Sequence, residues 1–142
     1  MREVTLLLRE WSGCLSVGIR LTDSDDFPYY ETRGFPPEFV ELERHLCRHD
    51  RHGHVVRDTA GNPEFDCMCG NIISGRFGPA KSFFSARGSF WTNSTTRLLA
   101  TTAEDDRQVL TRHRCICQGH ESVALVPLRA GEKTYGLLQL IQ

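Results

Sequence analysis

The pattern of hydrophobic and polar residues predicts a helix and then a strand hairpin in the first part of the chain. Apolar residues at the helical spacing i, i+3, i+4 and i+7 are Val4, Leu7, Leu8 and Trp11. In residues 14–21 apolar residues occupy every second position instead, so the apolar side chains at 15, 17, 19 and 21 share one face of a strand. A second strand over 27–32 follows an acidic turn, and the two strands should pair as a hairpin.

The middle of the chain predicts short helices around a polar insertion. Pro36 and Pro37 open a helix whose buried stripe would be Phe39, Leu42 and Leu46. Residues 48–64 are polar, rich in His and Arg, and form an insertion loop. A short helix over 67–74 follows, and residues 75–88 look irregular.

The last part of the chain predicts a short strand, a helix and a second hairpin. The strand covers 89–93 with Trp91 turned inward, and a capping box at 101–104 opens a helix that ends near His113. The nearly apolar run 122–129 predicts a strand buried on both faces, and 134–141 is the final strand. No helix closes the chain after this strand, so we expect a longer parent protein to continue beyond Gln142.

This order of elements predicts an α+β fold, with helices on both faces of a central antiparallel sheet in one domain over residues 1–142. The net charge of −1 gives no support for nucleic-acid binding. No apolar run approaches the roughly 20 residues that span a bilayer, and no signal peptide or internal repeat is visible. Six cysteines without a secretory signal predict reduced thiols in the cytoplasm, with metal, cofactor or redox chemistry.

Two pairs of cysteines, each separated by one residue, are the main chemical signal. If Asp66 caps the short helix, Cys67 and Cys69 lie in its first turn, where free N–H groups and the helix dipole stabilise a thiolate. The second pair is Cys115 and Cys117, with His113 and His120 beside it. We expect the two segments to meet across one pocket. Arg20 and Arg33, which flank the first hairpin, are interpreted as solvated charges.

Several segments resemble GAF domains, the small-molecule and cofactor-sensing modules of signalling proteins. They are the first strand 14–21, the stretch 30–35, the short helix 69–73 and the terminal hairpin 122–128 with 135–140, whose Pro-Leu and Gly-Leu-Leu pattern is the most telling. The chain is most similar to GAF domains that accompany PAS domains in bacterial and archaeal sensor histidine kinases, which carry segments like 67–70 and 90–93.

This resemblance implies a PAS-related fold, a small-molecule ligand and a cytoplasmic input domain without catalytic residues of its own. It also implies adjacent PAS or kinase domains and a homodimer formed through the terminal helices, with no membrane contact by this domain. The loop over 48–64 is long enough to cover the ligand pocket.

Four interpretations of the thiols stay open. They can be small buried hydrophobic residues. They can attach a cofactor such as haem, with the contacts Cys67, Cys69, Cys115 and His113, or with His120 as the axial ligand. They can hold zinc or an iron–sulfur cluster through a set drawn from Cys47, Cys67, Cys69, Cys115 and Cys117.

The fourth interpretation is enzymatic and rests on a second resemblance. Free methionine-(R)-sulfoxide reductases with this fold carry a cysteine at the position of Cys69, and another near Cys115 or Cys117. In that chemistry a thiolate attacks the sulfoxide sulfur, and a second thiol resolves the intermediate as a disulfide. A simpler redox switch, a disulfide between the two segments, is compatible with each of the other interpretations.

Overall fold

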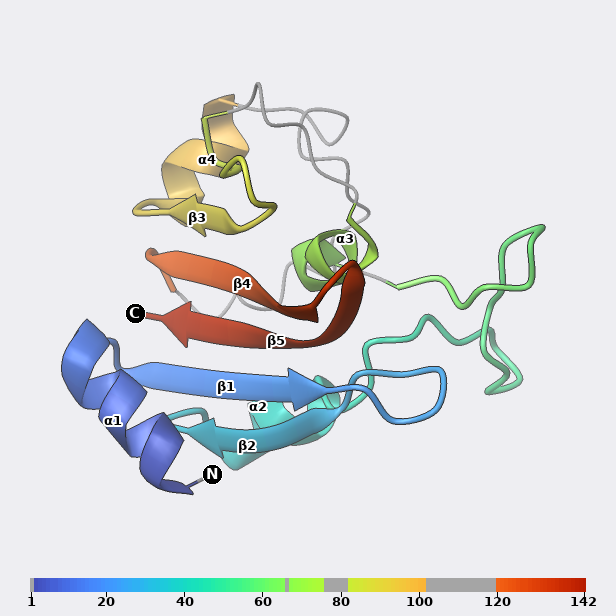
Figure 1. The fold of residues 1–142 in the computed structure, drawn as a ribbon, viewed down its shortest axis with the longest axis horizontal. Coiled ribbons are helices and arrows are strands. Elements are labelled where there is room, and N and C mark those ends of the chain that lie inside the picture. The colour runs from blue at the N-terminus through green and yellow to red at the C-terminus, as the bar shows by residue number, and fades with distance from the viewer. Residues whose placement is uncertain (1, 66, 76–81, 102–119) are drawn as a thin grey trace.

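In the computed structural model, residues 2–65, 67–75, 82–101 and 120–142 are described. The helices among them are α1 (Arg2–Ser12), α2 (Pro37–Leu42), α3 (Cys67–Ser74) and α4 (Thr95–Thr101). The strands are β1 (Ser16–Leu21), β2 (Tyr29–Arg33), β3 (Phe90–Thr92), β4 (Val123–Ala130) and β5 (Lys133–Ile141). Within these residues the strands form an antiparallel sheet in the order β2-β1-β5-β4-β3 (Figure 1). The predicted α+β class and both hairpins are confirmed.

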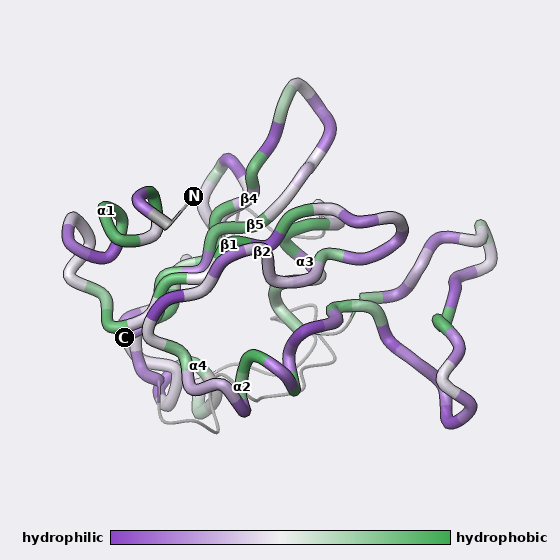
Figure 2. Tube along the Cα trace, turned by 90° about the horizontal axis from the view of Figure 1, so that it is seen from below, coloured by the Kyte–Doolittle hydropathy of each residue, from purple (hydrophilic) through white to green (hydrophobic). Residues whose placement is uncertain are grey.

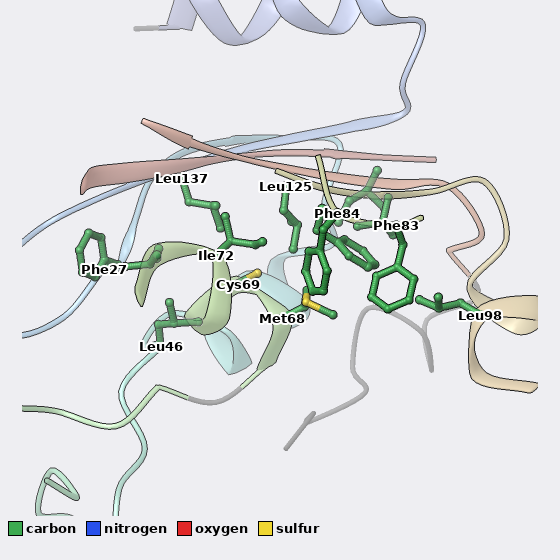
Figure 3. Packing of buried hydrophobic residues seen from close by; sticks show 14 of the residues in the cluster. Phe27, Leu46, Met68, Cys69, Ile72, Phe83, Phe84, Leu98, Leu125 and Leu137 are labelled. Atoms are coloured by element: carbon green, nitrogen blue, oxygen red, sulfur yellow. The ribbon is translucent and has the colours of Figure 1, made fainter. Parts of the chain in front are cut away.

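Helices lie on both faces of this sheet, as predicted. Seen along the sheet, α1 lies on one side, and α2, α3 and α4 lie on the other (Figure 2). The main hydrophobic core fills the α3 side, where Leu125 and Leu137 point from the strands toward Ile72 of α3 (Figure 3). Since side chains alternate along a strand, Val17 and Ile19 of β1 face α1, and Gly18 and Arg20 face α3.

Three elements differ from their predictions for identifiable reasons. The helix α2 ends at Leu42, which is exposed, and Leu46 reaches the core from the segment after the helix. In β3 the inward position belongs to Phe90, so Trp91 points outward and is 49% exposed. The strand β4 buries Val123 and Leu125 on its α3 face, but its other face is only half-buried.

The helix α4 was not predicted, because the capping box lies at its end rather than before its start. Its actual start is ordered by Glu121, whose carboxylate accepts hydrogen bonds from Ser94 and Thr96. Most of the predicted 101–113 helix lies outside the described residues. No helix within the described ranges is both long enough and apolar enough to cross a membrane.

The insertion 48–64 is an arm that extends away from the sheet in both views, rather than folding over it (Figures 1 and 2). It contains two equivalent turns eight residues apart, a local repeat that the sequence pattern did not reveal. The carboxylate of Asp50 accepts N–H bonds from residues 52 and 54 at 2.8 and 3.0 Å, and that of Asp58 accepts from residues 60 and 62 at 2.9 Å each. Backbone bonds then join residues 48, 56 and 64 in a closed ring.

Gly34 should be the glycine on which the first hairpin depends most. It has φ +85°, and a Cβ there would lie 2.1 Å from the carbonyl oxygen of Leu15. Gly61 in the arm has φ +83° but has no atom within 4 Å of the same position. Gly61→Ala should lower the free energy of unfolding by about 1–2 kcal/mol from backbone strain alone. Gly34→Ala should lower it by at least about 2 kcal/mol more, since backbone must also move.

Urea denaturation of the two variants, followed by far-ultraviolet circular dichroism, measures this difference. Equal losses in the two variants would contradict the close approach of Gly34 to the Leu15 carbonyl.

Candidate functional site

The helix α3 covers the core side of the sheet at the residues predicted for it, 67–74. Residues 68–73 are all buried, and the polar Asn71 is among them. Gly70 is required by packing, since a Cβ there would lie 2.4 Å from the Cβ of Phe65. Cys67 begins the helix with φ +74°, a left-handed conformation that favours glycine. The predicted cap, Asp66, lies outside the described residues.

Cys69 points from α3 toward the sheet, where it meets the amide of Gln139 (Figure 3 shows Cys69 in the core). The Gln139 Nε2 group donates to the Cys69 sulfur at 3.0 Å. Burial raises the pKa of the Cys69 thiol to about 12, and the opposing effect of the Arg20 charge is smaller. The predicted stabilisation of a Cys69 thiolate at the helix start is therefore wrong, because desolvation by burial favours the protonated thiol.

Cys47 is also a buried thiol, but it belongs to a different neighbourhood. Its S–H donates to the carbonyl oxygen of Asp25 at 3.0 Å. Burial, with a further contribution from the charge of Asp26, raises the pKa of Cys47 to about 12. In the described part of the chain, no three His, Cys, Asp or Glu side chains are grouped so that they could hold a metal ion. Cys115 and Cys117 lie outside that part, so the predicted metal set stays a prediction.

The predicted cofactor contacts are described only in part, because His113 and Cys115 also lie outside the described residues. His120 is described, and its ring packs edge-on against Phe35 and Phe39, with centroids 6.4 and 6.3 Å away. Burial lowers the pKa of His120, so the ring is neutral at pH 7. Its Nε2 atom is buried and makes no hydrogen bond to any described residue.

Arg20 is the residue that sequence reasoning misjudged most. It is 1% exposed, so its interpretation as a solvated charge is wrong. Its Nη1 donates to the carbonyl oxygen of Phe27 at 2.9 Å, and its Nη2 donates to that of Glu43 at 2.6 Å. The Tyr29 ring lies 3.8 Å from the guanidinium carbon. The sequence did offer a signal for this burial. The predicted fold places helices on both faces of the sheet, so the polar face of β1, which carries Arg20, is covered as well as the apolar face.

Gln139 was not singled out from the sequence, although it is 1% exposed. It pairs with Gly18 across β1 and β5, so its side chain lies above a residue that has none. A Cβ on Gly18 would meet three side-chain atoms, from Tyr29, Gln139 and Phe35, at 2.9, 3.0 and 3.2 Å. Gln139 Oε1 and Arg20 Nε are both buried without a hydrogen bond to any described residue. We call Arg20, Cys69 and Gln139 the buried polar layer.

An open hollow of about 360 Å³ lies elsewhere, between the end of α3 and the turn that joins β4 to β5. Its lining residues are Ile73, Ser74, Gly75, Arg129, Gly131, Glu132 and Thr134. Among the described residues, neither the predicted site residues Cys47, Cys67 and Cys69 nor any member of the buried polar layer lines it. The layer, and not this hollow, is therefore the candidate site.

The architecture around this layer is a GAF-like α+β fold. No protein-family model matches the chain, and no curated protein matches it. Solved structures match over nearly its whole length. The GAF domain of a phosphoenolpyruvate-protein phosphotransferase from Acinetobacter has a TM-score of 0.54 at 13% identity, covering 98% of this chain and 62% of that one.

Two structures from Staphylococcus aureus match similarly. NreA, described with its nitrate-binding site mutated, has a TM-score of 0.55 at 12% identity and covers 99% of this chain and 81% of that one. The hypothetical protein SA1058 has a TM-score of 0.52 at 11% identity, and the match covers 99% of this chain and 90% of that one. The implied fold is confirmed, and at these identities the likeness extends to the fold alone. The chain spans less than two thirds of the Acinetobacter structure.

The buried thiols predict a loss of stability in alkali. Above about pH 9, a thiol in the unfolded chain ionises, whereas folded Cys47 and Cys69 stay protonated up to about pH 12. The unfolded state then binds fewer protons, so the free energy of unfolding should fall as pH rises through this window. Cys69→Ala removes one of these thiols and should make the fall shallower.

Urea denaturation of the wild type and variant between about pH 8 and pH 11 measures this slope. Met68→Ala is the control, because it removes a buried side chain that does not titrate and should lower stability equally at every pH. A Cys69→Ala slope equal to that of the wild type would show that the Cys69 thiol is not held protonated by the fold.

Proposed function

We propose that this chain is a sensory domain that binds a small molecule between the α3 face of the sheet and the helix α3. The observation that carries the proposal is the buried polar layer, two of whose buried polar atoms have no hydrogen-bond partner among the described residues. Burying a polar group costs free energy unless the group is hydrogen-bonded, and most buried polar atoms in proteins have a partner. Arg20 Nε and Gln139 Oε1 lack one among the described residues. A bound ligand would supply these missing partners.

The GAF resemblance and the structural likeness support the same class of function. NreA, which has a comparable fold, is described as having a nitrate-binding site. We extend small-ligand recognition to this chain as part of the proposal. By the resemblance of segments 67–70 and 90–93, the domain would act as an input module of a cytoplasmic signalling protein with PAS or kinase domains.

Haem is a second candidate ligand, favoured by one observation. His120 Nε2 is buried and has no hydrogen-bonding partner among the described residues, and a neutral imidazole is a standard iron ligand. Cys67 or Cys69 would contribute a cysteine, as the sequence predicts. The reductase interpretation has less support, since the Cys69 thiol is protonated at neutral pH and the thiolate is the reactive form.

A panel of small metabolites and haemin tests the ligand site by thermal unfolding and absorption spectroscopy. At least one compound should raise the melting temperature of the wild type saturably, since a ligand that binds only the folded state stabilises it. Gly18→Ala should abolish this rise, because its Cβ would push aside Tyr29 and Gln139. Gly53→Ala in the arm, with no atom near the new Cβ, should retain it.

A Soret band that shifts with dithionite would identify haem as the ligand. A panel without any saturable response would contradict the proposed function. A response that survives Gly18→Ala would instead place the ligand elsewhere.

We also propose that the domain forms a homodimer through α1. The helix turns Thr5 toward the sheet, where it is fully buried, while its apolar stripe faces outward. Val4 and Leu7 are exposed, and Trp11 is 78% exposed. Leu15, which follows the helix, is exposed as well. An apolar stripe of this kind is typical of helices that pair with another helix.

Sedimentation velocity of the double variant Leu7→Glu/Trp11→Glu tests this interface. The wild type should sediment as a dimer and the double variant as a monomer, because two charges would be buried without partners. Glu10→Gln, an exposed change on the same helix, should leave the dimer intact. A monomeric wild type, or a dimeric double variant, would contradict the α1 interface.

A further inference from the structure

We propose that the ligand of the buried polar layer is a small anion, a carboxylate or another oxyanion, that binds over Gly18 and pairs with Arg20. This inference rests on the proposed function and names the chemical class of its ligand. It follows from the charge of Arg20, the position of its unused donor and the composition of the walls around Gly18.

The charge of Arg20 is the first step. Its guanidinium is 1% exposed and always carries a positive charge. Its partners in the described structure are carbonyl oxygens and the Tyr29 ring, and no carboxylate there forms an ion pair with it. Even at Glu43, a backbone oxygen accepts the bond. A buried charge without an ion-pair partner is costly, so an anion next to Arg20 is favoured.

The position of the unused donor is the second step. The carbonyl oxygens of Phe27 and Glu43 hold the two terminal nitrogens at 2.9 and 2.6 Å, which fixes the plane of the guanidinium. The Nε–H group is left buried without an acceptor in the described structure. A donor whose direction is already fixed binds an anion without further loss of side-chain freedom.

The walls around Gly18 are the third step. The three atoms nearest to a Cβ at this position are all ends of side chains, from Tyr29, Gln139 and Phe35. At Gly34 and Gly136, by contrast, the nearest atoms are backbone carbonyl oxygens. The position over Gly18 is therefore closed by side chains and not by backbone, so a ligand would enter there by displacing side-chain atoms.

Gln139 supplies the second polar contact in this arrangement. Its Nε2 now donates to the Cys69 sulfur at 3.0 Å. A thiol is both a weak donor and a weak acceptor, so either end of the amide can face Cys69. When the amide turns, its N–H₂ group faces the space over Gly18 and can donate to the same anion as Arg20.

Calorimetric titration of the full chain with sodium acetate and sodium nitrate tests the inference, with sodium chloride at equal ionic strength as the reference and acetamide as the neutral isostere of acetate. At least one oxyanion should bind saturably, while chloride and acetamide should not. Binding of acetate alone would identify the ligand as a carboxylate, and binding of nitrate alone would identify it as an inorganic oxyanion. Either result supports the anion site.

Gln139→Glu is the decisive variant, because it keeps the size of the side chain and places a carboxylate beside Arg20. The oxyanion affinity should fall at least tenfold, about the loss expected for one hydrogen bond to a charged group. Gln142→Glu makes the same chemical change at an exposed residue and should keep the affinity within about twofold. Arg20→Lys, with Arg48→Lys in the arm as its control, should weaken binding in the same direction.

Unchanged oxyanion binding in Gln139→Glu would overturn the inference, as would an absence of saturable binding by both oxyanions. Binding of a neutral compound that is lost in Gly18→Ala would overturn the anion class but leave the proposed function standing. If neither oxyanions nor any neutral compound of the metabolite panel bind, both fail together.

Discussion

Hydrogen bonds from Arg20 to the backbone carbonyls of Phe27, Glu43 and Arg44 join three segments that are distant in sequence. They connect β1 to the approach to β2 at Phe27, and to the end of α2 at Glu43. The last carbonyl groups of a helix have no partner within it, and Arg20 provides one for the segment where α2 ends. In the segment that follows this attachment the chain returns to the core, where Leu46 is buried although Leu42 is exposed. The same attachment holds the guanidinium against the Tyr29 ring, which also contacts the position over Gly18.

The sheet separates two surfaces with different properties, and β1 contributes to both. On the α3 side, Arg20 lies in the polar layer that we propose as the ligand site. On the other side, Val17 and Ile19 lie under α1, whose outer stripe is apolar. β1 therefore carries residues of the proposed ligand site on one face and the residues that lie under α1 on the other.

The sequence predicted the strands well because their side chains alternate with a period of two, and α3 because its apolar run is short and bounded. The prediction failed at positions whose burial is decided by tertiary contacts. In β3, for example, Phe90 and not Trp91 points into the core. The sequence placed Cys69 correctly on α3 but predicted the wrong ionisation state for its thiol. Desolvation of the thiol depends on packing against β5, which the sequence pattern does not show. Arg20 was interpreted as a solvated charge and Gln139 was not singled out, for a related reason: a polar residue in a strand is expected to be exposed until both faces of the sheet are known to be covered.

The most direct test of this account is the side-chain Nε–H resonance of Arg20 in a ¹⁵N-correlated nuclear magnetic resonance spectrum, assigned by its loss in Arg20→Lys. The account predicts an Nε–H group protected from exchange with water, whose resonance shifts saturably as an oxyanion is added and stays still with acetamide. An Arg20 Nε–H that exchanges as fast as those of exposed arginines, or that does not respond to any oxyanion, would contradict the buried anion site.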